Sequence, residues 1–261
     1  PRGGQGKDPM KAEAIGLRGY QRAKYASAIH YALIIETANA PVRSLADWRD
    51  TVVPFLVEHY FRDPRYLVLN NKPVVIFFGG IKGAGDQAVA HQVLIEACKA
   101  AGFDGATSVG LSHEKGFDYT YRYAKSFEAE GITNRINSPS VNWDRRGWDS
   151  PYNTQGTWKS AAEYQALLVA QKEQARSKTG LAKTLWMLGN WNEYGEGHFL
   201  MPTEGLGFRY LDAVRTVFGD GSAHQDFIPS EEQKARINVL YPPERSRMLR
   251  QRSTNESPKT K

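Results

Sequence analysis

Two glutamates three residues apart, Glu193 and Glu196, are the residues of this chain best suited to chemistry. They follow the apolar run 184–188 and lie in the segment Gly-Asn-Trp-Asn-Glu-Tyr-Gly-Glu-Gly-His, residues 189–198. If the chain turns helically there, the two side chains project from one face with Cβ atoms about 5–6 Å apart. Paired carboxylates on that scale cleave glycosidic bonds, because one acts on the leaving oxygen and the other assists at the anomeric carbon.

A structural role is the alternative for the same two acids. Carboxylates in the first turn of a helix stabilise its positive end, so the pair could simply open the next helix. The neighbouring amide, aromatic and imidazole groups favour a binding site instead. We therefore expect four neighbours to bind substrate, namely Trp191, Asn192, Tyr194 and His198.

The elements that must position these residues alternate between strand and helix. Apolar runs predict strands at 28–35, 74–78, 105–110, 136–141 and 184–189. Helical patterns and caps lie between them, at 10–25, from Ser44, and at 86–101, 119–130, 160–175 and 208–218. Such alternation predicts a parallel sheet. Continuous apolar runs fit strands that are covered on both faces.

Ligands of such folds gather where the strands end. The residues just past the expected strand ends are polar or aromatic: 36–39, Gly79-Gly80, His113-Glu114, 143–148 and 193–198. From these we expect Glu36, Trp143, Asp144 and Trp148 to contact substrate on one rim with the glutamate pair. Core packing is the competing explanation for the two tryptophans.

Length and composition limit which other classes of protein and of binding site fit this chain. At 261 residues and 41% apolar, the chain has the size of one α/β-barrel domain. The single Cys98 excludes an internal disulfide, and no Cys/His spacing suggests zinc. The glycines at 79–85 lack a phosphate-loop or dinucleotide pattern, so we expect neither a cofactor nor a metal. No stretch reaches the roughly 18 apolar residues of a membrane span.

The net charge of +6 does not indicate nucleic-acid binding, because it is unevenly distributed. Residues 231–261 hold eight Lys and Arg against four Glu, a net +4 that leaves only +2 for the rest. This segment is rich in Pro, Ser and Arg, which is typical of a flexible extension. We therefore expect a catalytic domain at residues 1–225 and a basic tail at 226–261.

Three segments of the chain resemble glycoside hydrolase family 99 and the related WbsX-type proteins of bacterial polysaccharide loci. The first is Trp-Asn-Glu-Tyr-Gly-Glu-Gly-His-Phe-Leu-Met-Pro at 191–202, beside the family's Trp-Asn-Glu-Trp-x-Glu-Gly. The others are Asp-Pro-Arg-Tyr at 63–66 before Lys72-Pro73, and Asn-Trp-Asp-Arg at 142–145. The resemblance runs from roughly Tyr25 to Gly219.

The resemblance implies a (β/α)8 TIM-type barrel that acts on α-mannoside-like linkages of a polysaccharide or glycan with retention. It assigns Glu193 to assist the sugar's own 2-hydroxyl in attacking the anomeric carbon, and Glu196 to act as general acid and then base. Two departures concern specificity. An early block with two tryptophans is replaced here by Glu-Thr-Ala-Asn-Ala-Pro at 36–41, and Gly195 stands where the hydrolases often have His.

Two other functions compete with hydrolysis. One is a WbsX-type role in polysaccharide biosynthesis, such as that of a glycosyltransferase, and the other is a carbohydrate-binding barrel without catalysis. Five strands are visible against eight in a full barrel, and the chain starts at Pro1 rather than Met. We therefore expect the first strands to lie upstream of this chain, and no localisation follows from the sequence.

Overall fold

The structure is a computed structural model of the chain. It describes residues 12–24, 26–36, 42–111, 116–123, 134–144, 156, 158–203, 205–222 and 230–232. Contacts between Cα atoms divide the chain into a first unit, Pro1–Phe218, and a second, Gly219–Lys261. The sheet, the helices around it and the candidate site all lie in the first unit.

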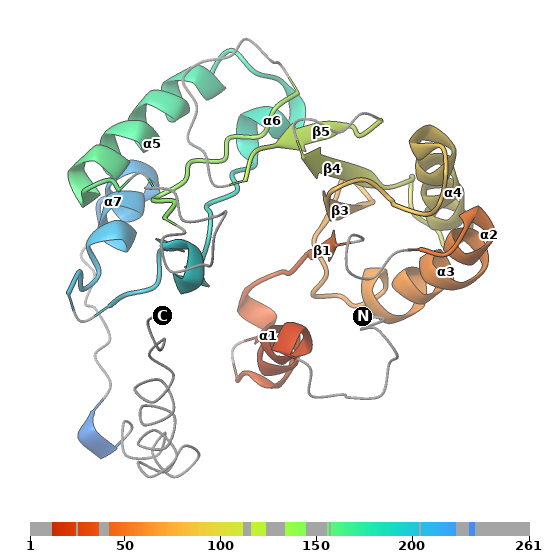
Figure 1. The fold of residues 1–261 in the computed structure, drawn as a ribbon, viewed down its shortest axis with the longest axis horizontal. Helices are drawn as coiled ribbons and strands as arrows, with labels where there is room; N and C mark the ends of the chain where they lie inside the picture. Colours follow the sequence, from red (N-terminus) through yellow and green to blue (C-terminus); the bar gives the residue numbers. More distant parts are fainter. Residues whose placement is uncertain are drawn as a thin grey trace, which may run out of the picture. The chain divides into compact units, whose positions relative to one another are not determined.

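A parallel sheet organises the first unit (Figure 1). Its strand order is β1-β3-β4-β5, formed by Leu33–Glu36, Lys72–Phe78, Thr107–Leu111 and Tyr119–Tyr121. A short strand, β2 (Val68–Leu69), pairs antiparallel with β3. In the parallel register Glu36 lies opposite Phe78, and Val109 lies opposite Tyr119. The predicted α/β fold with a parallel sheet is thus confirmed.

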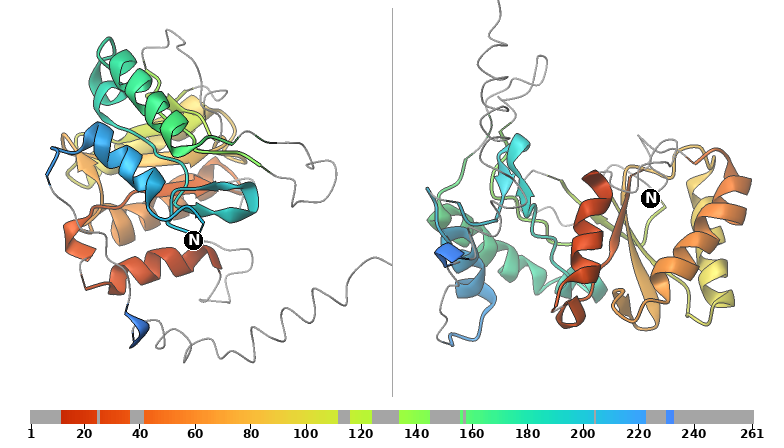
Figure 2. Two further views of the ribbon diagram at one scale, coloured as in Figure 1. Left: turned by 90° about the vertical axis from the view of Figure 1, so that its left-hand side faces the viewer. Right: turned by 90° about the horizontal axis from the view of Figure 1, so that it is seen from below.

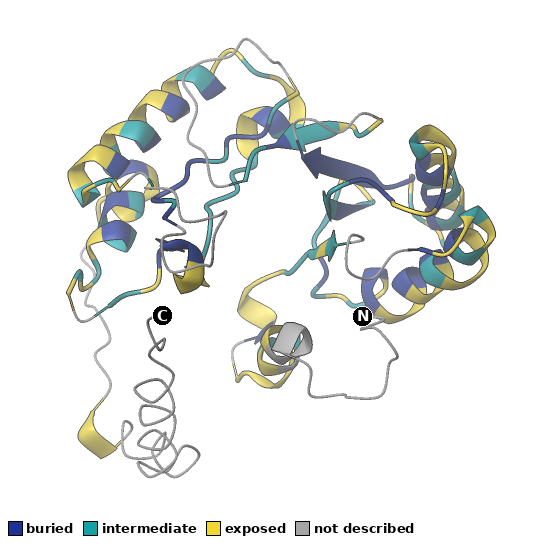
Figure 3. Ribbon diagram, viewed as in Figure 1, coloured by how far each residue is buried: buried dark blue, intermediate teal, exposed yellow. Residues whose placement is uncertain are grey.

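Burial explains why these apolar runs form strands. All five residues of β4 are buried, and in β3 Val74, Val75 and Phe77 have no exposed surface (Figure 3). Side chains of both faces are therefore covered, as a parallel sheet requires. Asn70 and Asn71 join β2 to β3 with φ of 50° and 53°, the left-handed pair that a tight hairpin turn needs.

Beyond β5 the parallel order continues through single bridges. Residue 120 pairs with 135, 137 with 186, and 140 with 189, all in parallel. The strands predicted at 136–141 and 184–189 are therefore extended segments without continuous ladders. Pro139 cannot donate a ladder hydrogen bond, which limits the first segment. Thr184 ends a helix, which shortens the second.

The helices follow in chain order. They are α1 (Ala12–Arg22), η1 (Ala26–Ala28), α2 (Leu45–Asp47), η2 (Trp48–Val52), α3 (Val53–Leu56), η3 (Val57–Phe61), α4 (Gln87–Ala100), α5 (Ala161–Ala175), α6 (Gly180–Thr184), η4 (Tyr194–Glu196) and α7 (Arg209–Phe218). The short strands β6 (Asn192–Glu193) and β7 (His198–Phe199) flank η4. The Ser160–Glu163 capping box that the sequence predicts opens α5.

Two packed regions hold these helices in place. The segment from α2 to η3 and helix α4 pack on the sheet through a core that includes Trp48, Phe61, Phe77 and Leu94. The indole of Trp48 also donates a hydrogen bond of 2.8 Å to the carbonyl of Ala90 in α4. Helices α5 and α7 lie side by side in Figures 1 and 2, around a second core with Tyr164, Leu168, Tyr210, Ala213 and Val217.

Two predicted elements are wrong. Residues 119–121, predicted as the start of a helix, form β5; residues 124–130 of that prediction lie outside the described residues. The alternating tyrosines at 119, 121 and 123 are a strand pattern. The strand predicted at 28–35 is confined to Leu33–Glu36, because Ala26–Ala28 form a 3-10 turn and Ile29 is 67% exposed.

Candidate active site

The glutamate pair lies in a short hairpin. Strands β6 and β7 pair antiparallel with Glu193 opposite His198, and η4 is the single 3-10 turn between them. Gly197 follows the turn at φ 60°, a left-handed conformation that glycine adopts without steric cost. Glu193 precedes the turn and is exposed, whereas Glu196 ends it and is only 8% exposed. The two carboxyl groups therefore have different surroundings.

Tyr123 contacts the buried member of the pair. Its hydroxyl donates a hydrogen bond of 2.5 Å to Oε2 of Glu196. Tyr123 comes two residues after β5, at the carboxyl end of the parallel sheet. Burial raises the pKa of Tyr123 most, followed by the hydrogen bond and charge of Glu196 and then the charge of Glu193. The phenol thus stays protonated, because burial and the charges of both glutamates disfavour its ionised form.

A second set of hydrogen bonds extends from Tyr123 to His198. The Nδ2 of Asn190 donates to the hydroxyl oxygen of Tyr123 at 3.0 Å and lies 3.3 Å from Nδ1 of His198. The Oγ of Ser140 donates to the carbonyl of Asn142 at 3.1 Å, so it accepts from Nε2 of His198 at 3.0 Å. These partners place the single imidazole proton on Nε2. Burial lowers the pKa of His198 to about 4, so this ring is neutral near pH 7.

Trp143 and Asp144 lie next to the residues just described, Trp143 beside Tyr123 and Asp144 beside Glu196. The ring of Trp143 meets that of Tyr123 edge-to-face, with centroids 5.6 Å apart. The amide of Asp144 donates to the carbonyl of Glu196 at 2.6 Å, and its Oδ2 accepts from the indole of Trp158 at 2.6 Å. Asp144 is buried, and its carboxylate holds the side chain of Trp158 next to the turn that carries Glu196.

Glu36 lies at the same edge of the sheet. It ends β1 in register with Phe78, the last residue of β3. The ring of Phe78 contacts that of Tyr123 at 5.1 Å, nearly perpendicular. The ends of β3 and β5 therefore meet at the ring of Tyr123, whose hydroxyl binds Glu196, and Glu36 ends the strand next to β3.

The remaining expected contacts divide into two groups. Trp191, Asn192 and Tyr194 are exposed on the hairpin or just before it. Trp148, His113 and Glu114 lie outside the described residues.

Several site residues were not predicted from the sequence. Tyr123 was missed because its segment was assigned to a helix, although its alternation with the two preceding tyrosines indicates a strand that ends at this rim. Ser140 lies at the end of one extended segment, and Asn190 directly follows the other. Their positions at the segment ends are the sequence signal that indicates a place at this rim. Trp158 follows no apolar run, so no sequence signal placed it here.

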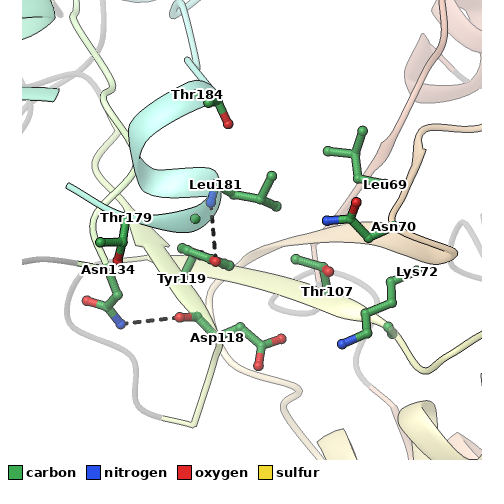
Figure 4. A pocket seen from close by; sticks show the side chains of 12 residues that line it. Leu69, Asn70, Lys72, Thr107, Asp118, Tyr119, Asn134, Thr179, Leu181 and Thr184 are labelled. Carbon is green, nitrogen blue, oxygen red and sulfur yellow. Dashed lines mark hydrogen bonds between the residues drawn. The ribbon is translucent and has the colours of Figure 1, made fainter. Parts of the chain in front are cut away.

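A separate pocket of about 660 Å³ opens at the other end of the sheet (Figure 4). It is lined by the first residues of three parallel strands, Lys72, Thr107 and Tyr119. Asp118 is the acid among its described lining residues, and the amide and hydroxyl of Ser108 already bind its Oδ2. The described residues at this end therefore include no carboxylate pair, in contrast to the opposite rim with Glu193 and Glu196.

In the part of the chain that the structure describes, no group of three or more His, Cys, Asp or Glu side chains is arranged to hold a metal ion. Within the same residues, every helix is too short or too polar to span a bilayer.

Comparison with known proteins gives matches of structure alone. No family model and no curated protein matches this chain. The structure is similar to that of a glycoside hydrolase-like protein, with a TM-score of 0.52 and 14% identity over 70% of this chain and 67% of the other. It also matches a structure of the GH99 endo-alpha-mannosidase from Bacteroides thetaiotaomicron, with a TM-score of 0.45 and 15% identity over 74% and 67% of the two chains. The chain thus shares its α/β fold with a glycoside hydrolase-like protein.

Proposed function

We propose that this protein is a glycoside hydrolase that cleaves α-mannoside-like linkages with retention. The observation that carries the proposal is the pair Glu193 and Glu196. Glu193 is exposed and Glu196 is buried, and, after burial, the charges of both raise the pKa of Tyr123. Two carboxyl groups in different surroundings suit two different proton-transfer roles. The fold shared with a glycoside hydrolase-like protein supports the same class of activity.

The first chemical step opens the glycosidic bond. The carboxylate of Glu193 takes the proton of the sugar's 2-hydroxyl as that oxygen attacks the anomeric carbon. The carboxylic acid of Glu196 gives its proton to the leaving glycosidic oxygen, so the bond to the anomeric carbon breaks. The products are a 1,2-anhydro sugar, the released alcohol, a protonated Glu193 and an ionised Glu196.

The second step adds water and resets the site. Glu196, now a carboxylate, removes a proton from a water molecule that attacks the anomeric carbon. The 1,2-anhydro ring opens, and Glu193 returns its proton to the sugar's 2-oxygen. Two inversions at the same carbon give net retention, and both acids recover their starting protonation.

The linkage follows from this chemistry. In an α-mannoside the 2-oxygen and the glycosidic oxygen lie on opposite faces of the ring, so the 2-oxygen can attack behind the leaving group. In an α-glucoside the two oxygens lie on the same face, and this attack is impossible. An α-mannoside therefore suits the assisted mechanism.

We also infer that the parallel sheet belongs to a (β/α)8 barrel. The support is the continued parallel order beyond β5, through the bridges to residues 135, 186 and 189. The gathering of Glu36, Tyr123, Trp143 and Glu196 at the carboxyl ends of the strands fits the usual position of active sites in such barrels.

The decisive experiment compares two substrates. We expect the chain to hydrolyse α-mannosyl fluoride and α-linked manno-oligosaccharides and to release the α-anomer first, as followed by proton NMR. The 2-deoxy analogue of the fluoride, corrected for its spontaneous hydrolysis, should be inert because it lacks the internal nucleophile. Normal enzymatic cleavage of the 2-deoxy analogue would make the mechanism wrong. Absence of cleavage of every α-mannoside would favour transfer or simple binding.

A further inference from the structure

Two half-exposed aromatic rings flank the turn that carries Glu196. Tyr194 is 49% exposed and Trp158 is also 49% exposed. Both rest on the buried ring of Phe199, at centroid distances of 4.9 Å for Tyr194 and 6.2 Å for Trp158. Exposed aromatic rings with a rigid support are suited to pack against another flat apolar surface.

Trp158 is fixed by more than this ring contact. Its indole nitrogen donates to Oδ2 of Asp144 at 2.6 Å, and Asp144 is itself 8% exposed. A side-chain carbon placed on Gly197 would lie 3.1 Å from Cζ2 of Trp158, so the indole edge packs against the backbone directly after Glu196. The orientation of the exposed indole is therefore set by a buried carboxylate and a close backbone contact.

The same anchor connects the indole to Glu196. The amide of Asp144 donates to the carbonyl of Glu196 at 2.6 Å, while its side chain accepts from Trp158. Trp158 is thus held on the Glu196 side of the hairpin. Glu193 lies at the other end of the same turn, opposite His198.

We propose that Trp158, with Tyr194, forms the stacking platform for the sugar on the leaving-group side of the scissile bond. The inference rests on the proposed function, because a general acid at Glu196 must face the leaving oxygen. The C–H groups of one pyranose face pack on the indole, and removal of that apolar area from water stabilises the complex. The leaving group recognised is therefore a sugar rather than a small alcohol.

Asp144 is a positioning residue in this arrangement. It acts through Trp158, because its carboxylate accepts the hydrogen bond that helps to fix the orientation of the indole. Asn at this position keeps an oxygen acceptor for the indole, whereas Ala removes it. The two variants therefore separate the loss of the acceptor from the loss of charge.

The experiment measures kcat/KM of wild type, Trp158→Ala and Trp158→Phe on two substrates. α-Mannosyl fluoride has no sugar as its leaving group, whereas an α-linked manno-oligosaccharide does. For Trp158→Ala the loss on the oligosaccharide should exceed the loss on the fluoride by about tenfold or more. Trp158→Phe keeps an aromatic face and should show a smaller excess. Phe55→Ala, which removes another ring that is 42% exposed, is the matched control and should show no excess.

Equal losses on the two substrates, or no loss, would overturn the platform while leaving the proposed hydrolysis intact. Asp144→Ala should repeat the substrate-dependent excess and shift the fluorescence of Trp158, and Asp144→Asn should restore both in part. If wild type cleaves neither substrate, the proposed function fails. Titration of tryptophan fluorescence with the oligosaccharide then decides: identical curves for wild type and Trp158→Ala overturn the platform.

Discussion

The hydroxyl of Tyr123 and the carboxylate of Glu196 meet at 2.5 Å across 73 residues of sequence. The phenol sits between Trp143, Phe78 and His198, all of which contact its ring nearly edge-on. Three aromatic neighbours fix where this hydroxyl points. Glu196 therefore has one oxygen held by a fixed donor, and the proposed mechanism uses its other oxygen for the substrate.

Replacement of Tyr123 by Phe should lower kcat more than it raises KM. The hydrogen bond strengthens as Glu196 loses its proton to the leaving oxygen. A hydrogen bond to a charged group is worth about 1.5–3 kcal/mol, so we expect kcat to fall by about tenfold to a hundredfold. The ring contacts remain, so the melting temperature should change little. Tyr121→Phe is the matched control, because its buried hydroxyl has no partner among the described residues. Equal kcat values for the two variants would contradict the role of Tyr123.

Replacement of either glutamate by Gln should separate their roles. Both variants should lose several orders of magnitude on an unactivated oligosaccharide. On α-mannosyl fluoride, Glu196→Gln should recover much of its rate for the first step, since fluoride needs little acid assistance. Glu193→Gln should not recover, because the 2-hydroxyl still needs a base. Stopped-flow measurement of fluoride release provides the readout, and a reversed pattern would exchange the two roles.

Replacement of Gly197 by Ala should destabilise the protein more than the same change at Gly207. The two glycines have similar φ, 60° and 55°, so both variants bear a left-handed backbone cost of about 1–2 kcal/mol. An added carbon at Gly207 meets nothing within 4 Å, whereas at Gly197 it lies 3.1 Å from both Asp144 and Trp158. The free energy of unfolding in urea gives the comparison. Equal losses would mean that the contacts around Gly197 yield without cost.

Acid should destabilise the protein partly through His198. Its pKa falls from an ordinary 6.5 to about 4 in the folded state, so the unfolded chain binds the proton more tightly. The associated stability is complete above about pH 6.5 and is lost as the pH falls to about 4, at most about 3 kcal/mol. His198→Gln should show a flatter dependence of unfolding free energy on pH in this window. A parallel curve for wild type and variant would contradict this assignment.

Local signals in the sequence predicted most of the fold. Ser44, Asp86 and Ser160 accept the backbone hydrogen bonds expected of helix caps, and the run from Val74 to Phe78 forms a parallel strand. These features depend on neighbours within a few residues, so the sequence alone can indicate them.

The site was only partly predictable, because its connections are not local. The acid pair was found from its spacing and its position after a strand. The partners of the pair could not be found in that way: Trp158 reaches Asp144 from outside any regular element, and Asn190 links Tyr123 to His198 only after the chain has folded. The alternation of Tyr119, Tyr121 and Tyr123 indicates the strand that leads to this rim, whereas the predicted helix does not place Tyr123 there.

The wide sequence separation of these partners has a consequence for how the protein folds during its synthesis. A polypeptide emerges from the ribosome in order, so β5 is complete at Tyr121 long before Phe199 is synthesised. Contacts such as Tyr123 to Glu196 and Ser140 to His198 span 73 and 58 residues, and closing loops of that length must precede any gain from them. The nascent chain therefore forms the sheet before it can form the candidate site. The site is completed only when the hairpin that carries Glu196 and His198 docks on the sheet.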